Sequence, residues 1–278
     1  MKRHFLPFLL PLLMILMLPL AYGEEDVHAL IQSGDPLTVE AKVLGPIPHV
    51  DSNFRVLQGG CVRDGYGWFA LIGADKAQYN HTTECYILKM NLETMEVIAQ
   101  SQMLKLAHAN DITYIPQTHE IYVIHTYKKL ISILDADTLE VKGTRKLPKE
   151  GYALDYEETS DRFVTAHGYA GMYFFNADLE QEKMIFGTET TLVTQGICCD
   201  EKYIYHVLWS SEDNTAEPDN MIFVFDWDGN LITKIPIGIN EHEPENITLI
   251  GDTFYIAFND RVERKCAWLY TMQLKKAE

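Results

Sequence analysis

The chain repeats one pattern of short strands five times from residue 58 to its end, and this repetition constrains the fold more than any other feature. Each repeat has a polar opening, two β-rich runs joined by a turn, and a further β-rich run next to an acidic turn. Apolar residues alternate at period two, as at Ile121 and Val123, and no convincing amphipathic helix is visible. The repeats open at Gln58, His108, Tyr152, Gln195 and Glu243.

The length of the repeats predicts their architecture. Asn91, Asp135, Asn176 and Asp226 occupy equivalent acidic turns, at spacings of 44, 41 and 50 residues. Repeats of this length suit four antiparallel strands each. We therefore expect an all-β fold, a β-propeller with five blades of four antiparallel strands. The last repeat lacks an outermost strand, and we expect the strand around Val39 to Val43, within the strand-like segment Leu37–Ile47, to supply it and close the ring.

The N-terminal segment resembles a targeting sequence. Residues 1–23 have a basic start at Lys2 and Arg3, an apolar core, and a small-residue end at Ala21-Tyr22-Gly23. This pattern predicts a signal peptide cleaved after Gly23, with an uncleaved membrane anchor as the alternative. We expect residues 24–50 to be a lead-in that contains the closing strand, and residues 51–278 to be the propeller domain. The mature protein would then be secreted, periplasmic or on the cell surface, without a membrane span.

The chain is acidic, with a formal net charge of −17. Nucleic acids and anionic lipids are bound through Lys and Arg, so such a surface repels both. We therefore expect no nucleic-acid partner, and instead a small molecule, a peptide or a protein. The acidity has a simpler explanation as well, because net charge keeps exported proteins soluble. We expect the protein to be a monomer.

The five cysteines fit either disulfides or buried free thiols. Cys61 and Cys198 share a repeat position, Cys199 follows directly, and Cys85 and Cys266 fall near the same place in the first and last repeats. A disulfide needs Cα atoms within about 7 Å, which repeat equivalence does not guarantee. No Cys or His spacing typical of zinc is present.

Polar residues mark the start of the innermost strand in each repeat, where a propeller has its central channel. Buried amides and carboxylates cost a few kcal/mol unless they are paired, so backbone, water or a ligand must satisfy them. Three alternatives stay open: a ring that binds only water and backbone, a site for a small molecule or peptide end, and a cation site. Equivalent positions are Gln58, Asn110, Tyr152, Gln195 and Glu245, with His108 and Glu243 two residues upstream and Asp111 one downstream.

These residues define the candidate site. Glu243 and Glu245 are the candidate catalytic groups, because carboxylates can act as acid or base. We expect no cofactor; the alternative is a calcium ion held in the channel by His108, the two carboxylates and amide oxygens. The sequence has no Gly-x-Ser-x-Gly elbow, P-loop or dinucleotide fingerprint. The candidate ligand-binding residues are Gln58, His108, Asn110, Asp111, Tyr152, Gln195 and Trp209.

Three motifs resemble the plant and bacterial type of glutaminyl cyclotransferase, a secreted five-bladed propeller. They are Gln58-Gly59-Gly60, Thr194-Gln195-Gly196-Ile197, and Glu245-Asn246-Ile247 followed by GDTFYIAF. The segments HANDITYIP and DADTLEV are similar to extracytoplasmic propellers of the YVTN and lactonase-like kind.

The resemblance implies that polar residues at the channel mouth bind an N-terminal glutamine and cyclise it, with Gln58, Gln195 and Glu245 at the matching positions. The chain departs from the family at Val193, where the family has phenylalanine, and at Leu57, where it has threonine. Val207-Leu208-Trp209 stands in place of the family's Leu-Thr-Trp.

Three functions follow, and the sequence leaves open whether the protein is an enzyme. The first is a propeller that binds a ligand or protein at its channel face without catalysis. The second is a cyclotransferase in which Glu245 or Glu243 acts as base. The third is a glycan-active propeller in which Glu243 or Glu245 acts with Asp111 or Asp155 of another blade.

Overall fold

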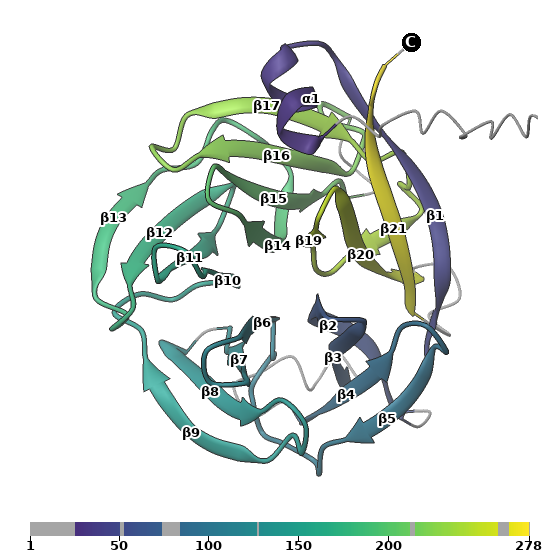
Figure 1. Ribbon diagram of the computed structural model, residues 1–278, viewed down its shortest axis with the longest axis vertical. Helices are drawn as coiled ribbons and strands as arrows, with labels where there is room; N and C mark the ends of the chain where they lie inside the picture. The colour runs from purple at the N-terminus through teal and green to yellow at the C-terminus, as the bar shows by residue number, and fades with distance from the viewer. Residues whose placement is uncertain are drawn as a thin grey trace, which may run out of the picture.

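Five sheets surround a central axis in the computed structural model, which describes residues 26–50, 53–73, 84–126, 128–211, 215–260 and 267–277 (Figure 1). Within the first four blades, the first strand lies nearest the axis and the last strand lies at the rim. The predicted all-β, five-bladed propeller is therefore confirmed. The predicted signal peptide, residues 1–23, lies outside the described residues. No helix in the described part of the chain is long and apolar enough to cross a membrane.

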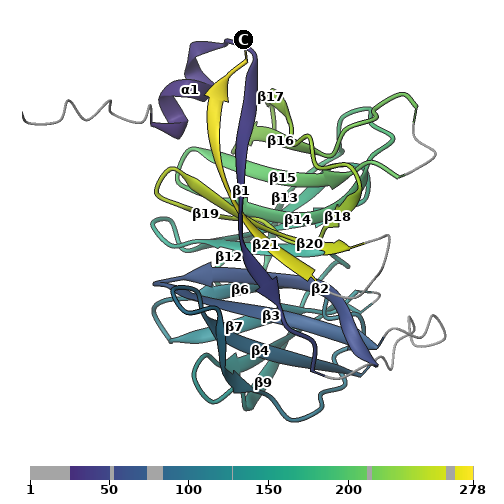
Figure 2. The ribbon, with the colours of Figure 1, turned by 90° about the vertical axis from the view of Figure 1, so that its right-hand side faces the viewer.

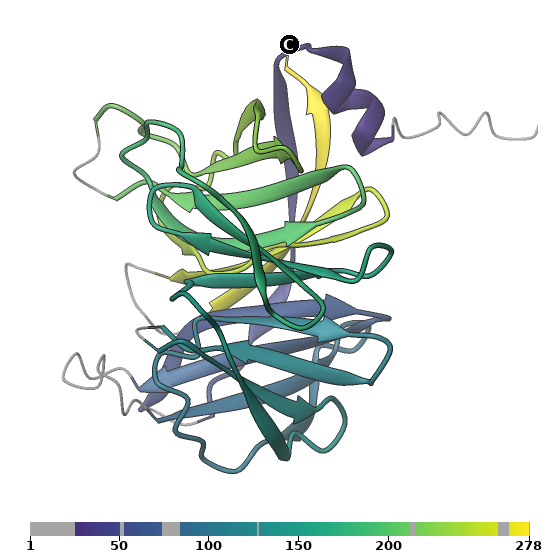
Figure 3. The same ribbon diagram turned by 90° about the vertical axis from the view of Figure 1, so that its left-hand side faces the viewer.

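The first four blades are four-stranded antiparallel meanders. Their loops gather at the two ends of the axis (Figure 2 and Figure 3). The first two blades comprise β2 (Phe54–Arg63), β3 (Tyr66–Gly73), β4 (Cys85–Asn91), β5 (Glu96–Gln100), β6 (Asp111–Ile115), β7 (Glu120–Ile124), β8 (Leu130–Asp135) and β9 (Val141–Lys146). The next two comprise β10 (Ala153–Glu157), β11 (Arg162–His167), β12 (Gly171–Asn176), β13 (Gln181–Ile185), β14 (Val193–Cys199), β15 (Tyr203–Trp209), β16 (Met221–Asp226) and β17 (Leu231–Pro236).

The fifth blade contains both described ends of the chain. Its innermost strand is divided into β18 (His242–Pro244) and β19 (Thr248–Ile250), which both pair with β20 (Thr253–Asp260). The outer half consists of β21 (Ala267–Lys276) and β1 (Leu37–Ile47). These two strands pair antiparallel from Leu37 opposite Lys276 to Ile47 opposite Ala267, and they run side by side in Figure 2.

A short helix precedes β1, where the sequence analysis found none. Helix α1 (Val27–Ser33) buries Val27, Leu30 and Ile31 against the fifth blade and the neighbouring fourth. Asp26 caps its first turn by accepting a hydrogen bond from the His28 backbone, and Gly34 ends it in the left-handed region. Seven residues make fewer than two turns, which is too short for the helical period to show in the sequence.

The repeated acidic turns are explained by side-chain capping of the backbone. Asn91 accepts hydrogen bonds from the backbone nitrogens of Glu93 and Thr94, at 2.9 and 3.1 Å. Asp135 accepts the same pair of bonds from Asp137 and Thr138. Asn and Asp favour such turns because their short side chains mimic a backbone acceptor.

The hydrophobic core is divided into five clusters, one between each pair of adjacent blades. The cluster between blades 5 and 1 joins Leu57, Phe69 and Leu71 to Ala257 and Leu269. Side chains that alternate along each strand fill both faces of the blades, which is why the period of two dominates the sequence. The packing brings the innermost strands of all five blades around one axis.

Candidate functional site at the channel mouth

Two bulges and one strand break place three of the candidate side chains. In β2, Leu57 pairs with Leu71 and Gly59 with Ala70, so Gln58 is an extra residue. Gln195 is the extra residue of β14 in the same way, and Glu245 lies in the break between β18 and β19. A bulge redirects the side chain it carries and is common beside active sites. We call this end of the axis the start mouth, defined by Gln58, Asn110, Tyr152, Gln195, Glu243 and Glu245.

Three of these positions differ from the prediction that each residue begins its strand. Gln58 and Gln195 lie inside β2 and β14, whose strands begin earlier at Phe54 and Val193. Glu245 follows β18, the first part of its innermost strand, which begins at His242. Asn110 and Tyr152 directly precede β6 and β10, as expected. The sequence did not reveal the earlier starts because a bulge shifts the alternation by one residue.

Glycine follows both glutamines because neighbouring innermost strands approach closely. A Cβ atom on Gly59 would lie 2.5 Å from the Asp111 Cα atom and 2.6 Å from the Asn110 carbonyl oxygen. A Cβ atom on Gly196 would lie 2.7 Å from the Asn246 Cα atom. In each Gln-Gly pair, the bulge turns the glutamine side chain toward the start mouth. The glycine that follows has no side chain and therefore fits against the next blade.

Hydrogen bonds connect the start mouth across blades 4, 5 and 1. The Gln195 side-chain nitrogen donates to Glu243 at 2.8 Å. Asn259 donates to the Glu245 carboxylate and also binds the backbone of Leu57, accepting from its nitrogen and donating to its oxygen, each at 2.9 Å. Gln58 donates to the Leu57 oxygen at 3.0 Å.

A second set of bonds connects blades 2 and 3. The Asn110 side chain donates to the Tyr152 carbonyl oxygen, and the Tyr152 ring stacks on His167 with centroids 6.1 Å apart. Asp111 is 2 % exposed and accepts from the backbone nitrogens of Ile112 and Leu154. These contacts form a second bonded group of polar residues at the start mouth, separate from the first.

The two candidate catalytic carboxyls have different environments. Glu245 is 3 % exposed, and burial raises its pKa well above the usual value, helped by the nearby charges of Glu243 and Asp111 and opposed by the hydrogen bond from Asn259. Glu243 is only partly buried. A buried carboxyl with a raised pKa beside a more exposed carboxyl is the arrangement that separates the roles of acid and base.

The remaining predicted residues lie around this centre. Burial lowers the pKa of His108 to about 4, so its imidazole is neutral at pH 7. Trp209 is half-buried at the end of β15 and pairs with Val193, so it lies across from the segment that leads into Gln195. Among the described residues, no three His, Cys, Asp or Glu side chains are grouped to hold a metal ion, and the calcium alternative stays a prediction.

Asn259 was missed by the sequence analysis, although it bonds both Glu245 and Leu57. The only feature of the sequence that points to Asn259 is its place as the polar residue directly after the apolar run Phe254–Phe258 in β20. The role of Asn259 becomes visible only when blades 5 and 1 are known to be in contact, because its partner Leu57 is 202 residues away in the sequence.

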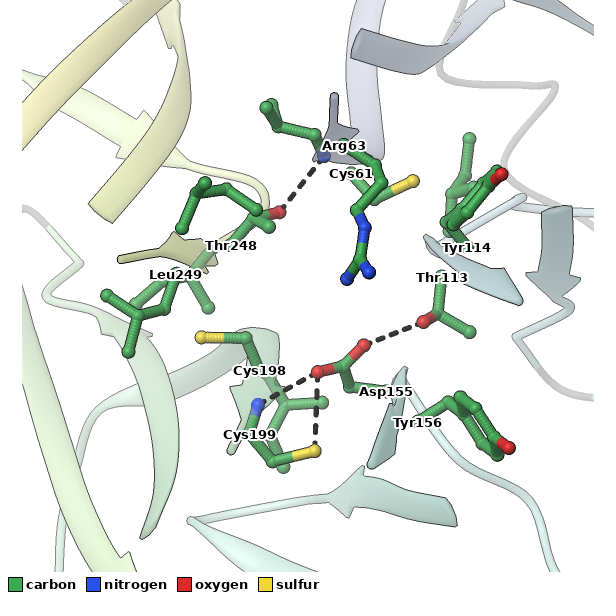
Figure 4. A pocket seen from close by; sticks show the side chains of 15 residues that line it. Cys61, Arg63, Thr113, Tyr114, Asp155, Tyr156, Cys198, Cys199, Thr248 and Leu249 are labelled. Atoms are coloured by element: carbon green, nitrogen blue, oxygen red, sulfur yellow. Dashed lines mark hydrogen bonds between the residues drawn. The ribbon is translucent and has the colours of Figure 1, made fainter. Parts of the chain in front are cut away.

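The opposite end of the axis contains a small cavity of about 80 Å³ (Figure 4). All five innermost strands line it, and Asp155 is held there by Thr113 at 2.6 Å and by the Cys199 nitrogen at 2.8 Å. Burial raises the pKa of Asp155. Cys61 and Cys198 share this cavity, as their common repeat position implies, and both are free thiols, as are Cys85 and Cys199. Cys266 lies outside the described residues.

Comparison with known proteins supports the fold. No family model matches the sequence, and no curated protein sequence is significantly similar to it. Among solved structures, the glutaminyl cyclase of Myxococcus xanthus matches with a TM-score of 0.58 and 14% identity, over 88% of this chain and 100% of the other.

Two further structures match at lower scores. The hydrazine synthase of Kuenenia stuttgartiensis has a TM-score of 0.45 and 10% identity, over 78% of this chain and 59% of the other. The WD40 repeats of RRP9 have a TM-score of 0.47 and 9% identity, over 85% of this chain and 98% of the other. The predicted resemblance to the glutaminyl cyclase type of propeller is thus confirmed at the level of fold: this five-bladed chain is similar in structure to the Myxococcus enzyme.

Proposed function

We propose that the start mouth binds the amino end of a peptide, with Glu243 as the group that receives the α-ammonium. The observation that carries this proposal is the bond from Gln195 to Glu243 beside the buried carboxyl of Glu245. A carboxylate has about four acceptor positions, so Glu243 can hold Gln195 and an ammonium together. A charge-assisted bond of this kind contributes more than a neutral one.

The half-buried rim supplies the rest of the site. Tyr152 and Trp209 offer ring faces to the apolar part of the first residue, and His108 and Asn110 offer polar groups to its backbone. Gln58, Gln195 and Asp111 are nearly buried and hold the rim in place through bonds within the ring. The acidic surface favours an amine over an anionic ligand.

Cyclisation of an N-terminal glutamine is the second candidate function, and the different environments of Glu243 and Glu245 favour it. The α-ammonium would first release one proton to solvent. The neutral α-amine nitrogen would then attack the side-chain amide carbon, forming a C–N bond while the bond to the amide nitrogen breaks. Glu243 would take a proton from the amine, and protonated Glu245 would give one to the departing nitrogen, which leaves as ammonia. A proton then returns from Glu243 to Glu245 and restores both groups.

Calorimetry with a glutaminyl peptide and its N-acetylated form tests binding. The free amine should bind, and N-acetylation should abolish binding. Glu243→Gln should weaken it about tenfold or more, the value of one charge-assisted bond. Glu241→Gln, at an exposed carboxyl two residues upstream, is the matched control and should bind normally. Equal binding of both peptides, or an unaffected Glu243→Gln variant, contradicts the proposal.

Mass spectrometry of the same peptide separates the two functions. Loss of one ammonia per peptide, abolished in Glu245→Gln, identifies the cyclotransferase. Binding without loss of ammonia identifies a binding protein and rejects the reaction. Export to an extracytoplasmic compartment and a monomeric state belong to the same proposal, since a peptide end must reach an open mouth.

A further inference from the structure

A second cleft lies between blades 1 and 2, at the face where β2 and β6 end, opposite the start mouth. Its volume is about 360 Å³, within the roughly 300 to 1,000 Å³ typical of small-molecule sites. Arg63 and Tyr114 line both this cleft and the cavity of Figure 4, so the cleft opens beside the axis. We call it the aromatic cleft, defined by Tyr66, Trp68, Lys89, Tyr114, His119 and Asp137.

One wall of the aromatic cleft is a rigid aromatic surface. Trp68 is 2 % exposed, and its indole nitrogen donates to the Ala136 carbonyl at 2.8 Å. Tyr114 stacks on Trp68 with centroids 5.3 Å apart, and Tyr66 lies tilted at 6.5 Å. Tyr66 and Tyr114 remain half-buried, so they present apolar ring surface to the cleft.

The polar edge of the cleft is a fixed chain of hydrogen bonds. The Lys89 ammonium contacts Asp137 at 2.6 Å, Asp137 contacts His119 at 2.9 Å, and His119 contacts the Tyr114 hydroxyl at 2.7 Å. Lys89 is nearly buried and lies over Tyr66 at 4.7 Å and Trp68 at 5.1 Å. Donors and acceptors therefore alternate along one side of the aromatic wall.

The charges of the cleft already have partners. Lys89 is paired with Asp137, and Arg63 with Glu158 at 3.2 Å and Asp64 at 3.8 Å. A charged ligand would have to displace one of these partners, and the group left unpaired would cost free energy. A neutral ligand with an apolar face and a hydrogen-bonding edge meets no such cost.

We propose that the aromatic cleft binds a neutral pyranose sugar. The flat C–H face of the ring lies on Tyr66 and Tyr114, and its hydroxyls bond Asp137, His119 and Lys89. A pyranose combines these two surfaces in one rigid body, and hydroxyls both donate and accept, as the alternating edge requires. The sugar is either free or the end of a glycan, and the length of the oligosaccharide distinguishes the two.

The test titrates the full-length protein with glucose, galactose, mannose, N-acetylglucosamine and their oligosaccharides. Tryptophan fluorescence and saturation-transfer NMR are the readouts, because Trp68 forms part of the wall. Glucuronate and benzoate are the anionic probes. Neutral sugars should bind, and the anionic probes should bind about tenfold more weakly or not at all. Stronger binding of oligosaccharides assigns a glycan end, and equal binding assigns a free sugar; both support the proposal.

Variants locate the bound sugar. Tyr66→Ala should weaken sugar binding about tenfold or more, and Tyr66→Phe should retain it. Asp137→Asn should weaken sugar binding and also lower the melting temperature, because the nearly buried Lys89 loses its charged partner. Glu241→Gln, at the other face, is the control. No saturation transfer to any neutral sugar, a preference for benzoate or glucuronate, or normal binding in both Tyr66→Ala and Asp137→Asn overturns the proposal.

Discussion

The side chain of Gln195 donates a 2.8 Å hydrogen bond to Glu243, which ties the bulge of β14 in the fourth blade to β18 in the fifth. The bond crosses an interface between blades beside the axis, where Glu245 is buried. Asn259 continues the connection to Leu57 in the first blade. A chain of polar contacts thus spans blades 4, 5 and 1 at the proposed ligand site.

Alanine at Gly59 should destabilise the protein, because the new Cβ atom would meet the backbone of Asn110 and Asp111 at 2.6 Å or less. Separating two innermost strands should cost about 1–3 kcal/mol or more of unfolding free energy. Gly143→Ala is the matched control, since its Cβ atom meets nothing within 4 Å. It should be neutral or slightly stabilising in a strand. Equal denaturation midpoints for the two variants would show that the close approach is absent.

Asn259→Ala should lower stability by about 2 kcal/mol or more, because the backbone nitrogen and oxygen of Leu57 both lose their side-chain partner. Asn230→Ala changes an exposed turn residue that bonds Asp226, and its effect should be a few tenths of a kcal/mol. Urea denaturation of both variants measures the difference. If Asn259→Ala loses no more unfolding free energy than Asn230→Ala, the Asn259 side chain does not hold blades 5 and 1 together.

His125 should make the protein sensitive to acid. Its ring bonds the Ser132 hydroxyl at 2.8 Å, and burial lowers its pKa from 6.5 to about 4. The unfolded chain therefore binds a proton between these values and the folded chain does not, so stability is present above pH 6.5 and is lost as pH falls through 4. The loss is on the order of 3 kcal/mol. Glutamine cannot titrate, so His125→Gln should reduce the fall of the melting temperature between pH 6.5 and 4. An unchanged dependence of the melting temperature on pH would rule out this role of His125.

Glu245 should make the protein less stable as the pH rises, which is opposite to the effect of His125. Burial raises its pKa above the value of 4.5, so the folded chain keeps a proton that the unfolded chain releases. Stability is fully present below about pH 4.5 and is lost as pH rises through the folded pKa. Glu245→Gln keeps the shape without the charge and should reduce this loss. Melting curves from pH 5 to 9 test it, and identical curves for both proteins would show that Glu245 ionises freely when folded.

The thiols should be inert in the folded protein. Burial raises the pKa of Cys61, Cys85, Cys198 and Cys199, so little thiolate forms at neutral pH. Alkylation at pH 7.5 followed by peptide mass mapping should leave all four unmodified until denaturant is added. Rapid labelling of Cys61, Cys85 or Cys198 in the native protein contradicts their burial, and rapid labelling of the half-buried Cys199 contradicts its raised pKa.

The fold was predictable because two local patterns recur along the sequence: the alternation of apolar and polar residues in each strand, and the length of each repeat. The segment Leu37–Ile47 forms β1 with the predicted bounds, and the Gln-Gly pairs mark where β2 and β14 pass the axis. Helix α1 was not predictable, since its three buried residues are too few to show a helical periodicity in the sequence.

The site was predictable only in part. The equivalent positions pointed to Gln195 and Glu245, with Glu243 two residues upstream, and these three residues lie close together at the start mouth. Asn259 and the aromatic cleft depend on contacts between different blades, which a single repeat does not encode. Trp68, Tyr66 and Tyr114 look like packing residues in the sequence, and only their arrangement around Lys89 reveals a cleft.

A crystal structure of the Glu245→Gln variant with a glutaminyl-glycine dipeptide would show where a peptide end binds. We expect the dipeptide at the start mouth, with its amino nitrogen in hydrogen-bonding contact with Glu243 and its side-chain amide facing position 245. A dipeptide bound elsewhere, or a start mouth that holds only water at a saturating peptide concentration, would contradict this expectation.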